Sequence, residues 1–258
     1  MTFQLADLLL LPIGVLIAVG YTSTGISGAN FWVPVFALWL RLEPAIAFWL
    51  ALVAMLFGSS SGLWRHRVQR TIDGGIAGRL LLISVPAALA GALLAPRLPV
   101  ELLGLGFGGF ALVCGGALLW ESRAEAPEAR TEGLPWGASA LGGLLTGLIS
   151  VGIGALVGPK MLRNERLWHH ARAAGTTLVV AFLTSLAAVL ARIDGELLRQ
   201  LRMGWPRILG VLVVVVPAVV LGGQLGPVIA RRAAGASMRR FAALLLVAAG
   251  VLMIVRFG

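Results

Sequence analysis

Ten apolar stretches, separated by short clusters of arginine, glycine and proline, occupy most of this chain of 258 residues. They cover residues 5–22, 29–40, 44–64, 76–95, 101–120, 137–150, 153–162, 171–192, 205–230 and 238–257. A helix rises about 1.5 Å per residue and the hydrocarbon core is about 30 Å thick, so a crossing needs about 20 residues. Six stretches are long enough to cross, and the first two of each half are marginal or too short. Because the runs lack polar alternation, they exclude a strand barrel and predict membrane helices.

The composition supports lipid as the solvent for most of the surface. Charged residues make up 12% of the chain, against about 25% in soluble domains. This shortage excludes a soluble enzyme and a disordered chain. The formal net charge of +10 would suggest nucleic acid in a soluble protein. Here the arginines lie between apolar runs, where they face lipid headgroups, so we expect a lipid bilayer and no nucleic acid as partner.

The two halves of the chain resemble each other. The segment Val85–Gly91 (VPAALAG) recurs as Val216–Gly222 (VPAVVLG), 131 positions later. The glycine-rich stretch before Pro34 is likewise echoed before Pro159. We therefore predict one membrane domain built from a first repeat at 1–120, a polar linker at 121–133 and a second repeat at 134–258.

Five apolar segments per half predict that the second repeat is inverted relative to the first. If the 65–79 loop is cytoplasmic, 14 basic residues lie inside and 7 outside, as the positive-inside rule requires. The exception is the 192–207 loop, which places four arginines outside. The predicted fold is an all-α polytopic membrane protein with two inverted repeats, each a short helix pair plus three long transmembrane helices. The short pairs either cross or re-enter, and we expect a multi-pass protein of the plasma or inner membrane.

Ionisable side chains are scarce inside the predicted spans. Asp7, Glu43, Glu101 and Asp194 all fall near segment ends, so no buried carboxylate relay is visible. The three histidines, His66, His169 and His170, lie in arginine-rich loops, where we expect solvent around them. No spacing of histidine, cysteine and aspartate predicts a metal site, and no cofactor is expected. The sequence also lacks the acid, base and nucleophile that an intramembrane enzyme would need.

The polar groups of the membrane interior collect at two glycine-rich breaks, Tyr21–Asn30 and Thr146–Gly154. A break frees backbone N–H groups, which together with hydroxyls can bind an anion. Broken backbone is tolerated at membrane depth where protein buries it or where it lines a cavity. The alternative interpretation is close helix packing through small residues. The candidate substrate-binding residues are Ser23, Thr24, Ser27, Gly28, Asn30, Ser150, Gly152, Gly154, Thr176 and Thr177.

These motifs resemble those of the TauE/SafE sulfite exporter family, also described as the toluene-sulfonate uptake permease family. In this family a glycine-rich stretch runs into a proline and precedes a helix that opens with an Ala-x-x-Thr-Ser-like pattern. The matching segments are Gly142–Gly147, Gly152–Gly154 and Pro159, followed by Ala173–Leu178, and in the first half Gly25–Asn30 with Val33 and Pro34. The first half departs from the pattern at Ala47–Leu50, which has no hydroxyl where the second half has Thr176 and Thr177.

The resemblance implies a transporter or permease for a small anion, such as sulfite, a sulfonate like sulfoacetate, or another organosulfur anion. An inside-negative potential favours export of such an anion over proton symport. A drug/metabolite-type permease, which also has two inverted five-helix repeats, is the second interpretation. A non-transport accessory subunit is the third, and a homodimer is one possible oligomeric state.

Overall fold

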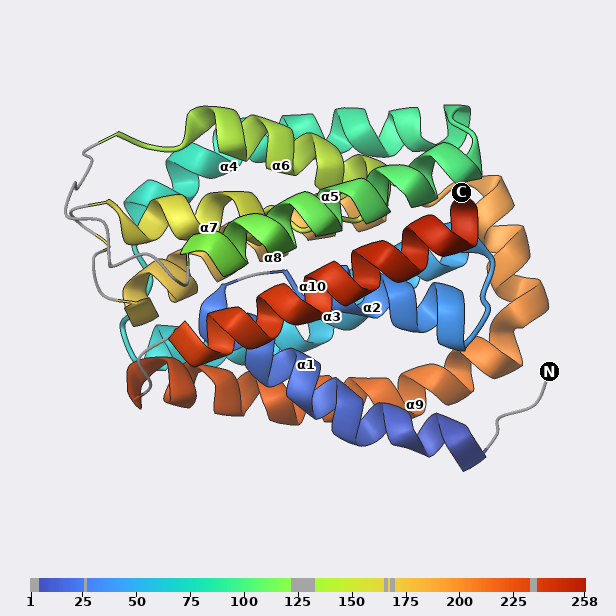
Figure 1. Cartoon of the computed structure of the whole chain (residues 1–258), viewed down its shortest axis with the longest axis horizontal. Helices are drawn as coiled ribbons and strands as arrows, with labels where there is room; N and C mark the ends of the chain where they lie inside the picture. Colours follow the sequence, from blue (N-terminus) through green and yellow to red (C-terminus); the bar gives the residue numbers. More distant parts are fainter. Residues whose placement is uncertain (1–4, 26, 122–132, 165–166, 168–169, 233–235) are drawn as a thin grey trace.

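The computed structural model describes residues 5–25, 27–121, 133–164, 167, 170–232 and 236–258. Every regular element in these ranges is a helix. In chain order they are η1 (Leu5–Leu9), α1 (Leu10–Thr24), α2 (Ala29–Pro34), η2 (Val35–Trp39), α3 (Pro44–Val68), α4 (Gly74–Leu94), η3 (Ala95–Arg97), α5 (Val100–Glu121), α6 (Trp136–Ile149), α7 (Gly154–Leu162), α8 (His170–Ala191), α9 (Gly195–Arg232) and α10 (Ala236–Phe257). The helices form one elongated bundle (Figure 1).

The ten apolar stretches correspond to these helices, and most boundaries agree within a few residues. Among the described residues, seven helices are long and apolar enough to cross a membrane. The seventh is Asp7–Thr24, with 18 residues, which the sequence marked as marginal because a crossing needs about 20 residues. The chain is therefore an integral, multi-pass membrane protein.

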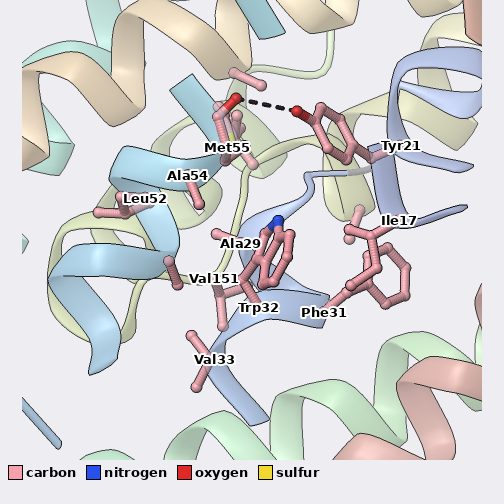
Figure 2. Packing of buried hydrophobic residues seen from close by; sticks show 14 of the residues in the cluster. Ile17, Tyr21, Ala29, Phe31, Trp32, Val33, Leu52, Ala54, Met55 and Val151 are labelled. Atoms are coloured by element: carbon pink, nitrogen blue, oxygen red, sulfur yellow. Dashed lines mark hydrogen bonds between the residues drawn. The ribbon is translucent and has the colours of Figure 1, made fainter. Parts of the chain in front are cut away.

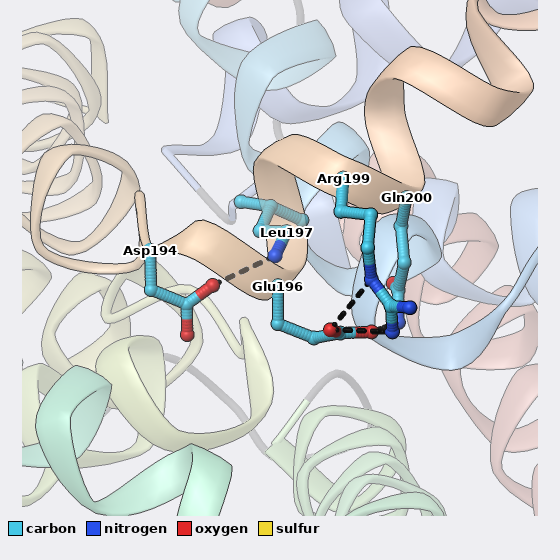
Figure 3. Close-up of polar contacts among 5 residues, drawn as sticks. All are labelled: Asp194, Glu196, Leu197, Arg199 and Gln200. Atoms are coloured by element: carbon cyan, nitrogen blue, oxygen red, sulfur yellow. Dashed lines mark hydrogen bonds and ion pairs between the residues drawn. The ribbon is translucent and has the colours of Figure 1, made fainter.

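Helix α9 differs most from the sequence prediction, because it begins ten residues before the apolar stretch at 205–230. The Asp194 carboxylate accepts a hydrogen bond from the Leu197 N–H (2.7 Å, Figure 3) and so caps the first turn. Pro206 lies inside the helix and cannot donate to the preceding turn. The early turns cross the end of the bundle before the helix bends and runs along α1 (Figure 1).

The two halves pack through matching helix pairs. Helix α1 packs along α9, and α6 packs along α4, while α5 pairs with α10. Glycines of the repeated segment permit the α4–α6 and α1–α9 contacts. A Cβ at Gly91 would overlap the Leu144 carbonyl oxygen, and a Cβ at Gly222 would overlap the Val15 carbonyl oxygen. Gly91 and Gly222 thus have equivalent roles, each against the first helix of the other half. The inverted orientation of the two repeats stays a prediction.

Each short helix pair forms a hairpin, in which the second helix runs back from the end of the first. The chain reverses between α1 and α2 and again between α6 and α7 (Figure 1). The α1–α2 hairpin opens toward the end of the bundle where α3 begins, and the α6–α7 hairpin opens toward the opposite end (Figure 1). The two reversals therefore meet inside the bundle, next to the long helices α3 and α8.

Candidate functional site

The two breaks have the same backbone conformation. Gly25 ends α1 with φ 76° and Ser150 ends α6 with φ 56°, both in the left-handed region. The Gly25 N–H donates to the Tyr21 carbonyl (2.8 Å), and the Ser150 N–H donates to the Thr146 carbonyl (3.1 Å). Each helix thus closes with an N–H bond to the carbonyl four residues earlier, and the chain then turns back.

Replacement of Gly25 by alanine is expected to lower the stability by about 1–2 kcal/mol, the usual cost of a left-handed conformation for a residue with a Cβ. The new Cβ would also lie 3.2 Å from the Ala174 Cα. Gly20 is the matched control in the same helix, because a Cβ there meets nothing within 4 Å. Thermal unfolding in detergent should show Gly20→Ala as neutral or stabilising and Gly25→Ala as destabilising. Equal midpoints for the two variants would contradict the assigned role of Gly25.

The reversals of the two hairpins pack directly against each other. The Gly152 N–H donates a hydrogen bond to Asn30 Oδ1 (2.9 Å), which joins the second break to the start of α2. A Cβ at Gly152 would overlap the Ser27 side chain, and one at Gly154 would overlap the Gly25 carbonyl oxygen. Five of the predicted residues, Ser27, Gly28, Asn30, Gly152 and Gly154, therefore lie in this buried junction, whereas sequence reasoning could not tell that the breaks meet.

Met55 of α3 lies beside the junction and is contacted from several sides. The Ser27 hydroxyl donates to Met55 Sδ (2.8 Å), and the Tyr21 hydroxyl donates to the Met55 carbonyl (3.2 Å, Figure 2). The Ser185 hydroxyl of α8 approaches the same sulfur at 3.9 Å. Tyr21 and Trp32 surround this point within the apolar core (Figure 2). The junction is thus held by both long central helices, α3 and α8.

Three buried polar atoms near the junction have no hydrogen-bond partner among the described residues. They are Asn30 Nδ2, Trp32 Nε1 and Thr177 Oγ1. Thr177 faces the first break, because its Cβ lies 3.3 Å from the position that a Gly25 Cβ would take. Amide and indole N–H groups can only donate, and a threonine hydroxyl can donate as well. Buried donors nearly always have an acceptor in folded proteins, so these three atoms are candidate donors to an acceptor-rich ligand.

Four other predicted residues use their hydroxyls for hydrogen bonds within the protein. Ser23 and Thr24 donate to the Gly20 carbonyl (3.0 and 2.8 Å), as hydroxyls inside helices commonly do. The Thr176 hydroxyl accepts from the Asp73 N–H (3.0 Å), and the Ser150 hydroxyl accepts from Arg192 (2.9 Å). The structure thus separates Thr177, which faces the junction, from its neighbour Thr176, which bonds the loop before α4.

Arg192 lies next to the second break, although the sequence placed it in an outer loop. Its Nε and Nη2 donate to the Gly147 carbonyl (3.0 and 2.7 Å), and its Nη1 donates to the Ser150 hydroxyl. Burial lowers the pKa of Arg192 to about 10, so the guanidinium stays charged at neutral pH. A fixed cation therefore contacts the end of α6, where the sequence predicted dipoles alone.

His66 lies at the equivalent place beside the first break. It is buried, which makes the prediction of a solvated loop histidine wrong. Its Nε2 bonds the Thr22 carbonyl (3.2 Å), and its Nδ1 bonds the Thr71 hydroxyl (2.7 Å). His66 follows Thr22 by 44 positions, and Arg192 follows Gly147 by 45. This similar spacing in the two halves is the sequence signal that could have related the two residues. Both side chains bind the last carbonyls of a helix, where a positive charge is favourable.

The described residues include no metal cluster: no three His, Cys, Asp or Glu side chains in these ranges lie close enough to hold an ion. The unpartnered polar groups at the junction are instead neutral hydrogen-bond donors, and the Arg192 guanidinium lies at the second break. Such a set suits a small anion, because oxyanions accept several hydrogen bonds at once. Its position between two hairpins, inside a membrane-spanning bundle, is the arrangement found in secondary transporters.

Comparison with known families supports this interpretation. The family profile described as "Sulfite exporter TauE/SafE" matches residues 10–253, which is nearly the whole chain. Searches of curated proteins and of solved structures found no match. The matched region includes both hairpins, every candidate residue and all the long helices except the C-terminal end of α10. The chain therefore belongs to the TauE/SafE sulfite exporter family, a family of membrane transporters for sulfite and related sulfur anions.

Proposed function

We propose that this protein exports a small sulfur oxyanion across the cell membrane, and that the junction of the two breaks is its binding site. The observation that carries the proposal is the group of buried donors, Asn30 Nδ2, Trp32 Nε1 and Thr177 Oγ1, which have no acceptor in the described part of the chain. Sulfite, or a sulfonate such as sulfoacetate, supplies three oxygen acceptors on one sulfur atom. Unpaired buried donors of this kind cost about 1–3 kcal/mol each, which an anion would recover.

The orientation of the Asn30 side chain supports this role. Because its Oδ1 accepts from the Gly152 N–H, the amide cannot flip without losing that bond. The buried Nδ2 group therefore keeps its two N–H donors available for an acceptor. Neutral donors bind an oxyanion without the strong ion pair that would delay its release. The membership of the sulfite exporter family supports the same class of substrate.

The membrane potential provides a driving force for export. Moving one negative charge out of a cell at an inside-negative potential gains about 2.3 kcal/mol per 100 mV. Export therefore needs no buried carboxylate to carry a proton. If the end of the bundle that contains the 68–74 connection faces the cytoplasm, the basic residues follow the positive-inside rule.

Flux into proteoliposomes tests the proposal directly. Purified protein should transport sulfite or sulfoacetate down an imposed potential, with the rate rising as the compartment that receives the anion becomes more positive. No flux of either anion at any potential would contradict the proposed function.

The neighbours Thr176 and Thr177 form a matched pair for locating the site. Replacing Thr177 with valine removes a buried hydroxyl that lacks a partner, and we expect the flux to fall about tenfold, in keeping with one lost hydrogen bond to a charged ligand. Replacing Thr176 with valine removes a contact with Asp73 and should leave the flux within a factor of two or so. Equal effects in the two variants would contradict a site at the junction. Thermal midpoints of both variants serve as the folding control.

A further inference from the structure

A pocket of about 240 Å³ opens at the end of the bundle where α8 is followed by α9. Its walls come from the start of α3, the start of α5 and the first turns of α9. Drug-sized ligands occupy pockets of about 300–1,000 Å³, so this one fits a smaller molecule. Its lining includes the apolar and aromatic residues Phe48, Trp49 and Leu103 and also Arg192. The pocket therefore combines an apolar surface with a cation.

The charge of Arg192 is not neutralised within the described residues. Its hydrogen bonds go to the Gly147 carbonyl and the Ser150 hydroxyl, which are both uncharged. Arg172 pairs with Asp73 and Arg199 with Glu196, so these two carboxylates are paired with other arginines. A charge that is partly buried without a counter-ion is costly, so groups of this kind are usually paired. Arg192 thus lacks an anionic partner while it faces a pocket.

The two carboxylates that also line the pocket are already engaged (Figure 3). Asp194 Oδ1 accepts from the Leu197 N–H and caps α9. Glu196 accepts hydrogen bonds from Arg199 (2.6 Å) and from Gln200 (2.9 Å). Glu196 is thus paired with Arg199, and the exposed Asp194 caps α9, so the Arg192 guanidinium is the group in the pocket that would attract an anion.

We propose that this pocket is a second anion site of the transporter, in which Arg192 binds the sulfonate group of an organic sulfonate and the aromatic wall packs on its carbon part. The proposal rests on the proposed function and adds a second binding site for the transported anion, outside the junction. Because Arg192 also holds Gly147 and Ser150, an anion in the pocket touches the residue that supports the second break. The apolar wall favours sulfonates that carry a hydrocarbon group over sulfite.

Binding to the full-length protein in detergent tests the site without requiring transport. Calorimetry with benzenesulfonate as the probe should give saturable binding, while the neutral isostere benzenesulfonamide binds weakly. Arg192→Gln should weaken benzenesulfonate about tenfold or more, and Arg192→Lys should weaken it less. Ala45→Trp is the second variant, because Ala45 is exposed and lines the pocket, so a bulky side chain there would occupy it while Arg192 is retained. We expect Ala45→Trp to abolish benzenesulfonate binding and to leave the thermal midpoint unchanged.

The outcomes separate this site from the function itself. Benzenesulfonate binding that is unchanged in both Arg192→Gln and Ala45→Trp overturns the second site, even where sulfite flux in the wild type continues. Binding at the pocket without any flux of sulfite or sulfonate contradicts the proposed function instead. Phosphatidylglycerol in nanodiscs provides the other source of an anionic group. Loss of benzenesulfonate binding in these nanodiscs, with retention in phosphatidylcholine, would assign the pocket to lipid and overturn the proposal.

Discussion

Replacing Gly152 with alanine is expected to destabilise the protein by about 3 kcal/mol, at the upper end of the range for overpacked cores, and to abolish anion transport. The reason is the contact between the two breaks. A Cβ at Gly152 would overlap both Cβ and Oγ of Ser27, and the Ser27 Cβ cannot move without its backbone. The substitution therefore pushes the hairpins apart and separates Asn30 from the Gly152 N–H.

A compensating change tests this explanation. Ser27→Gly removes the side chain that the new methyl group would overlap, so the double variant should recover most of the lost stability. This gain is a coupling between two substitutions that individually destabilise, as expected for residues in direct contact. Gly116→Ala is the control, since a Cβ there meets nothing within 4 Å. Thermal unfolding of the wild type, the two single variants, the double variant and the control in detergent gives the result, and additive effects in the double variant would refute the contact between the breaks.

Replacing Asn30 with aspartate is expected to reduce sulfite flux about a hundredfold. The carboxylate has the shape of the amide and keeps an acceptor for the Gly152 N–H, but it loses the two Nδ2 donors. Two lost hydrogen bonds to a charged ligand, at about 1.5 kcal/mol or more each, amount to roughly this factor. Where the carboxylate is ionised, its negative charge also repels the cargo.

Asn30→Ala distinguishes the two functions of the side chain. It removes the donors and also leaves the Gly152 N–H without its acceptor, so we expect a loss of stability of about 1–3 kcal/mol in addition to the loss of flux. Ser60→Ala is a suitable control, because this exposed hydroxyl bonds only the Phe57 carbonyl of its own helix in the described structure. Sulfite flux and the thermal midpoint of each variant, measured in parallel, separate the loss of binding from the loss of stability. Wild-type flux in Asn30→Asp would remove Asn30 from the binding site.

The helices and their lengths could be predicted from the sequence because hydropathy depends on each residue alone. Lipid requires about 20 consecutive apolar residues for a crossing, and the stretch at 44–64 shows this directly in α3. Helix α9 was predicted too short because its first turns depend on a cap by Asp194 rather than on apolar residues. The grouping of Ser27, Asn30 and Gly152 was anticipated only as two separate glycine-rich breaks.

The positions of His66 and Arg192 were not predicted, since charge next to an apolar run normally indicates a solvated loop. Each lies at the end of a long helix, and its surroundings depend on which hairpin reaches that end of the bundle. Arg192 meets Gly147 across 45 positions of the chain, and His66 meets Thr22 across 44. Local composition contains no information on contacts at such distances.

The sequence by itself determined that the chain lies in lipid and that two glycine-rich breaks interrupt its apolar stretches, and it predicts two similar halves. These properties follow from the transfer free energy of side chains and from the backbone freedom of glycine, which are local. Only the tertiary structure decided that the breaks pack against each other, that Thr177 rather than Thr176 faces them, and that Arg192 brings a charge to the second break. The physical reason is that burial and hydrogen bonding between hairpins depend on how the long helices pack, and small side chains such as Gly152 set that packing through contacts far apart in the chain.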